Sequence, residues 1–167
     1  MTLQEAKLLL AFNAWADNRI FDAVVQLPAD QYTKEMNSSH GSIHGTLAHL
    51  VGAQKRWLNR WQGSPEANPM SPAEVPTLKD LKAVWEKIGF ETAKFFGMMT
   101  DKKLQEAFPV TSPQGESYTL TFAQGLQHVV DHSTYHRGQI ITLMRQLGVK
   151  PPYTGMVGFF RESGKLR

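Results

Sequence analysis

The sequence predicts an all-α protein, a four-helix bundle with a crossover loop between helices two and three and a short hairpin-like excursion before the last helix. Three observations predict this fold. Four long segments carry apolar residues at the three-to-four-residue spacing of an amphipathic helix. Only one short stretch resembles paired strands, and 167 residues match one domain of ordinary size, over residues 1–167.

The first predicted helix covers residues 3–26 and ends before Pro28, since proline disfavours a helical conformation of the residue that precedes it. The second helix begins after Ser42, whose hydroxyl can cap a free backbone N–H, and runs to about Gln62. Its apolar stripe is interrupted only by Gln54.

The segment between the second and third helices, residues 63–76, holds four of the nine prolines and predicts an irregular crossover loop. A linker between two domains is the alternative, which we reject because neither side holds enough helices for a core. Thr77 is suited to cap the third helix, which extends to about Met99.

Before the last helix, Val110 and Tyr118 flank a Ser-Pro-Gln-Gly turn, which predicts a small hairpin or an extended excursion. The last helix spans about residues 121–147 and ends at Gly148, a residue favoured just beyond a helix. We expect the apolar side chains of the tail to pack back on the bundle: Met156, Val157, Phe159 and Phe160.

The composition is that of a globular protein, with 41% hydrophobic and 20% charged residues. The absence of cysteine excludes disulfides, thiolate ligands and a cysteine nucleophile, and fits the cytoplasm. The net charge is only +3, and the densest basic spot is interpreted as a solvated helix face, so nucleic acid is not expected as a partner: Lys55, Arg56 and Arg60. No signal peptide and no membrane-spanning segment is predicted, so no membrane partner is expected either.

All six histidines fall in two clusters: His40, His44 and His49, then His128, His132 and His136. Helical positions four apart differ by about 40° in azimuth, so two such imidazoles can point at one spot beside the helix. His132 and His136 lie on or beside the apolar stripe and therefore face the bundle interior. His128 is rotated about 80° from His136 and is a candidate for the surroundings of the site or the surface.

His49 lies at the edge of its helix's apolar stripe among small neighbours and can supply a third ligand. His44 is nearly 140° from His49 around the axis, so the two should not share a metal, and both His44 and His40 lie near the normally wet helix start. Three neutral ligands leave a divalent ion its full charge and an open position, which is the catalytic pattern. The alternative is ordinary core histidines, since a His-x-x-x-His spacing also occurs by chance. Without a glutamate after His132 the base of a zinc peptidase is missing.

Four further residues are candidates for the surroundings of the metal. Gln139 can orient a ligand, although a hydrogen bond within the bundle is favoured. Tyr135 can donate a proton or close the pocket, although core or rim packing is more common. Asn13 and Asp17 can accept from ligand imidazoles. Arg137 is interpreted as a member of a structural ion pair, and no catalytic residue is assigned.

The last-helix sequence HVVDHSTYHRGQI, residues 128–140, resembles the signature of the DinB family of DinB/YfiT-like metalloenzymes. The segments FNAWADN (12–18) and SIHGTLAHL (42–50) resemble the motifs of its first and second helices, and 111–122 resembles the turn before its last helix. Two positions depart from the family pattern, because Asp131 stands where Asn is common and Gly155 where an acidic residue is common.

The resemblance implies a four-helix bundle that binds a divalent metal through His49, His132 and His136, often as a homodimer. Family relatives include transferases and isomerases that use a low-molecular-weight thiol such as mycothiol or bacillithiol. We therefore expect a metal-dependent enzyme of the thiol S-transferase/isomerase or hydrolase type, with zinc or nickel as the metal and a small molecule or thiol as the partner. The alternative is a non-catalytic, metal-dependent bundle that binds a small ligand or a partner in a stress response.

Overall fold

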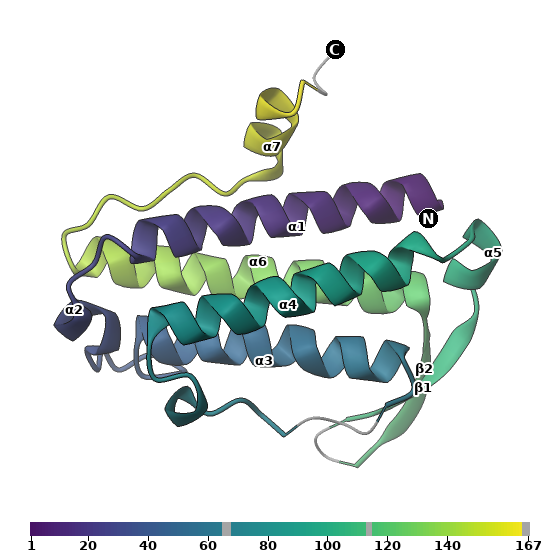
Figure 1. Ribbon diagram of the computed structural model, residues 1–167, viewed down its shortest axis with the longest axis horizontal. Helices are drawn as coiled ribbons and strands as arrows, with labels where there is room; N and C mark the ends of the chain where they lie inside the picture. Colours follow the sequence, from purple (N-terminus) through teal and green to yellow (C-terminus); the bar gives the residue numbers. More distant parts are fainter. Residues whose placement is uncertain (65–67, 113–114, 165–167) are drawn as a thin grey trace.

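Four long helices lie side by side in the computed structural model, which describes residues 1–64, 68–112 and 115–164 (Figure 1). These helices are α1 (Leu3–Val24), α3 (Ile43–Trp61), α4 (Leu78–Gly97) and α6 (Phe122–Gln146). They confirm the predicted all-α bundle, and each predicted helix is found with ends that differ by only one or two residues. Within the described ranges, none of the helices is both long and apolar enough to cross a membrane.

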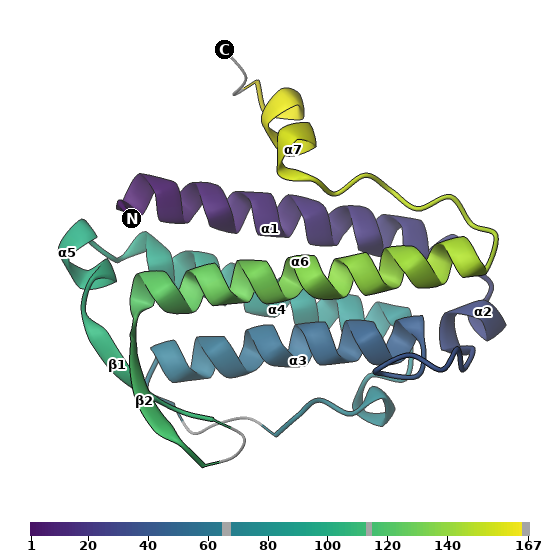
Figure 2. The ribbon, with the colours of Figure 1, turned by 180° about the vertical axis from the view of Figure 1, so that it is seen from behind.

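The order of the helices around the bundle is α1, α6, α3 and α4, with each packed against the next and α4 against α1. Helices α1 and α6 run one way and α3 and α4 run the other way (Figures 1 and 2). Neighbours α3 and α4 are thus parallel, so the chain must return along the bundle between them, as a crossover connection. The short helices α2 (Ala29–Thr33) and η1 (Pro72–Glu74) lie on the two connections that flank α3.

Side-chain caps explain where the long helices begin. The Ser42 hydroxyl accepts from the Gly45 N–H at 3.0 Å at the start of α3, as the sequence predicted. Thr77 accepts from the Asp80 N–H at 3.1 Å, while the Asp80 carboxylate accepts from the Thr77 N–H at 3.2 Å. Each such cap satisfies backbone N–H groups that have no partner within the helix.

A two-stranded hairpin leads directly into α6. Strands β1 (Ala107–Thr111) and β2 (Ser117–Thr121) are antiparallel, and Val110 pairs with Tyr118, which confirms the predicted hairpin. Short helix α5 (Asp101–Leu104) precedes β1. Because β2 ends where α6 begins, the hairpin fixes the first turn of the helix that carries His128, His132 and His136.

The tail returns to the bundle through one face of α7 (Met156–Glu162), which projects beyond α1 (Figure 1). Phe159 packs against Phe12 and Trp15, with ring centroids 5.9 and 5.8 Å apart. Val157 is 65% exposed and Met156 36% exposed, so the expectation that all four apolar tail residues pack back is wrong for these two. The short helix α7 rests on α1 with one face, so only the side chains on that face are buried.

A buried polar network joins three of the long helices. Arg137 of α6 and Asp17 of α1 are 1% and 2% exposed and form an ion pair at 2.6 Å. Arg137 also donates to the Asn13 side-chain oxygen at 2.8 Å. Gln54 of α3 donates to Asp17 at 2.8 Å and to the Ser133 hydroxyl at 3.3 Å. The network confirms the ion-pair interpretation of Arg137 and explains why Gln54 interrupts an apolar stripe.

Replacing Asp17 with alanine is expected to destabilise the protein by about 3–5 kcal/mol, because it leaves the Arg137 guanidinium buried without its counter-charge. The matched control is Asp22→Ala, which removes a pair with Lys82 in which the Asp22 side chain is 70% exposed. That loss is expected to stay below about 1 kcal/mol. Urea unfolding measures both values, and equal losses would contradict the assigned role of the network.

Candidate metal site

Four imidazoles meet between α3 and α6. His49 comes from α3, His132 and His136 come from α6, and His40 comes from the turn before α3. The His49 ring centroid lies 5.2 Å from that of His132, 4.5 Å from that of His136 and 4.0 Å from that of His40. The three histidines singled out by helical spacing thus lie together, and a fourth that the sequence placed at a wet helix start joins them.

The contacts of His132 set the geometry of this cluster. Its Nε2 lies 3.2 Å from His49 Nε2 and 3.1 Å from His136 Nε2. An imidazole nitrogen carries either one proton or one in-plane lone pair, so it can take part in only one of two such hydrogen bonds. Two nitrogens bound tetrahedrally to one zinc ion at about 2.0–2.1 Å lie roughly 3.3 Å apart. Both separations therefore fit a shared ion.

A second grouping includes the histidine from the turn. His40, His49 and His136 each offer one ring nitrogen, and these three atoms lie within 4.8 Å of one another. Three histidines of this chain are thus positioned to hold a metal ion. Imidazole nitrogen suits zinc, nickel, copper and iron, so the donor set fits the divalent metal that the sequence predicted.

Burial keeps these imidazoles neutral. Burial, reinforced by the neighbouring His136 and His49, lowers the pKa of His132 to about 3. Burial, reinforced by His40, His136 and Arg56, lowers the pKa of His49 to about 4. Burial also lowers the pKa of His136, against the opposing effect of its hydrogen bond to Gln139. At neutral pH each ring keeps a lone pair, which is the state that metal coordination requires.

The Gln139 side chain selects the tautomer of His136. Its Oε1 lies 2.8 Å from His136 Nδ1 and accepts the Nδ1–H. The proton is then on Nδ1, and the lone pair of Nε2 faces His132. A hydrogen bond to the distal ring nitrogen is the usual way in which proteins orient a ligand histidine. Gln139 was expected to make either such a bond or one within the bundle, and its partner is the site histidine itself.

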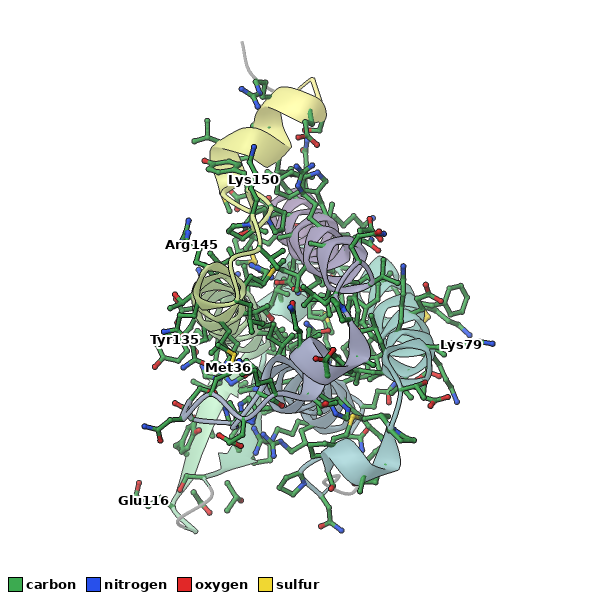
Figure 3. All side chains as sticks on the ribbon, turned by 90° about the vertical axis from the view of Figure 1, so that its left-hand side faces the viewer. Met36, Lys79, Glu116, Tyr135, Arg145 and Lys150 are labelled. Atoms are coloured by element: carbon green, nitrogen blue, oxygen red, sulfur yellow. The ribbon has the colours of Figure 1, made fainter. Side chains whose placement is uncertain are left out.

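Two of the other candidates lie at the edge of the cluster. The His128 ring packs on Trp57 at 4.9 Å and lies 5.8 Å from the His132 ring. Tyr135 is 65% exposed and meets the His136 ring edge-on at 5.1 Å. Figure 3 shows Tyr135 pointing outward from α6, away from the other long helices. Tyr135 therefore shields one side of His136 and does not close the cluster.

The structure corrects the expectation that Asn13 and Asp17 support the ligand imidazoles. Their hydrogen bonds go to Arg137, to Gln54 and to each other. Both residues lie on α1, outside the histidine cluster. There their oxygens accept hydrogen bonds from the buried guanidinium of Arg137, which requires a counter-charge. They affect the site indirectly, because their bonds to Arg137 hold α6 in position against α1.

His44 is buried and has an ordinary structural role. Its Nε2–H donates to the Val75 carbonyl at 2.8 Å, and its ring packs on Tyr32 with centroids 4.8 Å apart. It was expected in a wet cap region, but the crossover connection covers it. As the helical angle predicted, it points away from His49.

A cleft of about 480 Å³ opens beside His132, and its wall includes Arg56, Trp57, Arg60 and His128. Arg60 donates to the Thr111 carbonyl at 3.3 Å, and its guanidinium lies 5.0 Å from the Trp57 ring centre. A small molecule fits a cleft of this size. The basic spot of α3 is therefore only partly a solvated face, since both arginines are half-buried in this wall.

Helical spacing could have placed Arg56 near the site, but it could not have placed His40 there. Arg56 follows His49 by seven residues, which places it about 20° from the same line on the helix. His40 lies outside any regular helix, in a turn whose path no periodicity describes. A second cavity of about 390 Å³ between α1 and α4 has no histidine among its described lining residues.

A helical bundle in which imidazoles from two helices converge on one spot belongs to the class of bundles that could hold a metal ion. The sequence model of the DinB family matches residues 2–163, so the chain belongs to the DinB family. It is 25% identical over 147 residues to Protein DinB of Bacillus subtilis strain 168, covering 84% of each chain. It is 23% identical over 133 residues to the uncharacterized protein YizA of the same organism, covering 80% of this chain and 82% of YizA.

Solved structures support the same fold. A DinB-like protein from Bacillus cereus ATCC 10987 superposes with a TM-score of 0.63 at 19% identity, over 84% of this chain and 91% of that one. The DinB-like protein YjoA from Bacillus subtilis gives a TM-score of 0.62 at 18% identity, over 90% of this chain and 96% of that one. These likenesses establish the architecture of the chain.

The metal-free protein is expected to lose stability as the pH falls from about 7 to about 4. The folded-state pKa values of His49 and His132, about 4 and about 3, lie below the unfolded value of about 6.5. Between these limits the unfolded chain binds more protons, so the free energy of unfolding decreases with falling pH. Urea unfolding after chelator treatment measures this slope.

The variant pair His49→Gln and His132→Gln is the comparison for this pH dependence, because neither glutamine titrates. Its slope should be smaller by up to one proton for each histidine removed. A slope that is the same in the double variant would show that these imidazoles titrate normally in the folded protein.

Replacing Gln139 with leucine is expected to weaken metal binding by roughly 10–100-fold, because His136 loses the acceptor that fixes its tautomer. Gln139→Glu should retain most of the affinity, since a carboxylate oxygen accepts the same Nδ1–H. Competition with a chromophoric chelator measures both constants. Similar affinities for the leucine variant and the unmodified protein would exclude this orienting role.

Proposed function

We propose that this DinB-family protein is a metal-dependent enzyme whose ion is held by His49, His132 and His136. One observation carries the proposal, which is the position of His132 Nε2 at 3.2 and 3.1 Å from the Nε2 atoms of the other two. Hydrogen bonding accounts for one of these approaches, and a shared ion accounts for both. We expect zinc or nickel.

The reaction we propose is transfer or isomerisation with a low-molecular-weight thiol, or hydrolysis, on a small molecule. A divalent ion with three neutral ligands acts as a Lewis acid and lowers the pKa of a thiol or water at its open position. The chain has no cysteine, so the sulfur must come from outside the protein. The cleft beside His132 gives a small molecule a route to the cluster.

The residues of this chain contribute orientation and a dry environment. Gln139 holds the His136 ring with its lone pair toward the site, and burial keeps His49 and His132 unprotonated. Arg56 and Arg60 in the cleft wall face the approaching substrate. A cytoplasmic location, a homodimer and a role in stress response remain predictions, and nucleic acid is still not expected as a partner.

Elemental analysis of the natively purified protein tests the metal site. We expect close to one divalent ion per chain, and a loss of most of it in His49→Ala and in His132→Ala. His128→Ala is the matched control, because it removes an imidazole of α6 that lies 5.8 Å from the His132 ring, and it should retain the metal. The same trace metal in all four proteins would exclude the proposed ligand set.

Chelation tests whether the site is catalytic. Conjugation of several low-molecular-weight thiols to electrophiles should proceed with the metal-loaded protein, fall by at least about tenfold with chelator, and return when the metal is restored. His49→Ala should behave like the chelated protein. Metal binding that affects stability alone, with no chelator-sensitive turnover, would identify the non-catalytic bundle instead.

A further inference from the structure

His40 lies against the three proposed ligands, although it comes from outside both helices that carry them. Its ring stacks on His49 with centroids 4.0 Å apart and planes 18° apart, and its centroid is 5.3 Å from that of His136. One of its ring nitrogens falls in the group that lies within 4.8 Å with nitrogens of His49 and His136. It is half-buried.

The turn that carries His40 is held by several backbone features. Gly41 has a φ of +75°, a conformation that side chains disfavour, and its carbonyl accepts from the Met36 N–H at 2.8 Å. The His40 carbonyl would lie 1.9 Å from a Cβ at Gly45, so only glycine there lets the turn approach α3 this closely. The ring position is thus built into the backbone of the turn.

We propose that His40, supplied by the turn before α3, is a fourth ligand of the metal, on the side of the cluster that His49 and His136 form. This inference rests on the proposed function, because it requires an ion at the three-histidine site. Four nitrogen ligands complete the tetrahedral coordination that zinc prefers. A substrate or thiol must then compete with His40 or enter as a fifth ligand.

The position of His40 favours a role as a metal ligand over a role in ring stacking alone. Stacking alone needs only ring overlap with His49, and any flat side chain supplies that. The structure additionally brings a His40 ring nitrogen toward His136, on the opposite helix, and holds the turn by the left-handed conformation of Gly41 and the close approach of the His40 carbonyl to Gly45. His40 comes from a turn whereas the other three come from long helices, so His40 is the ligand that a substrate would displace.

Cobalt(II)-loaded protein provides a test that does not depend on activity, because its visible absorption reports the number and geometry of its ligands. Compared with the unmodified protein, His40→Ala should show an altered spectrum and at least about tenfold weaker cobalt binding in chelator competition. Free imidazole should restore the original spectrum of His40→Ala by saturable binding and leave the unmodified protein unchanged. His128→Ala, the matched histidine control, should keep the original spectrum and affinity.

A second variant separates ligation from a folding defect. Gly45→Ala keeps all six histidines in the sequence but pushes the turn, and His40 with it, away from α3, so it should reproduce the spectral change of His40→Ala while α3 stays helical. A His40→Ala protein with the original cobalt affinity and spectrum overturns the inference, and if His49→Ala and His132→Ala still lose cobalt the proposed site stands. If these two variants retain cobalt fully, the proposed site fails and the inference fails with it.

Discussion

The buried ion pair between Arg137 and Asp17 constrains the rest of the structure. A guanidinium that is 1% exposed must keep its counter-charge, so α6 can neither rotate nor slide against α1 without a large electrostatic cost. Arg137 directly follows His136, and Ser133, which binds Gln54 of α3, directly follows His132. The network on one face of α6 therefore fixes where His132 and His136, about 100° around the helix from it, point.

The histidine cluster contains crowded neutral rings, in contrast to the charged pair of Arg137 and Asp17. Imidazoles are crowded together and partly desolvated, so their pKa values fall and protonation is disfavoured. Each neutral imidazole carries one N–H and one lone pair, but His132 Nε2 faces two ring nitrogens at 3.2 and 3.1 Å and can hydrogen-bond with only one of them, an imbalance at the centre of the cluster. A divalent cation resolves that imbalance, which links the stability of this part of the bundle to the proposed metal and to the chemistry that the metal supports.

The order of the helices around the bundle shapes the cleft beside the histidine cluster. Because α3 and α4 are parallel neighbours, the connection between them must return along the bundle and cannot be a short turn. Its described part covers His44 through Val75 and contributes Asn68 and Pro69 to the cleft beside His132. The hairpin adds Tyr118 on the other side. A connection imposed by topology thus supplies walls to a cleft that two helices alone would leave open.

The sequence by itself determined the four helices, the caps at Ser42 and Thr77, the place of the hairpin and the inward direction of His49, His132 and His136, because these depend on local periodicity and short-range hydrogen bonds. The ion-pair role of Arg137 was also predictable. Tertiary structure alone decided that Asp17 and Asn13 bind Arg137 and that His40 joins the cluster. These outcomes depend on which segments far apart in the chain come into contact, and no helical period encodes the path of a turn or the partner of a buried charge.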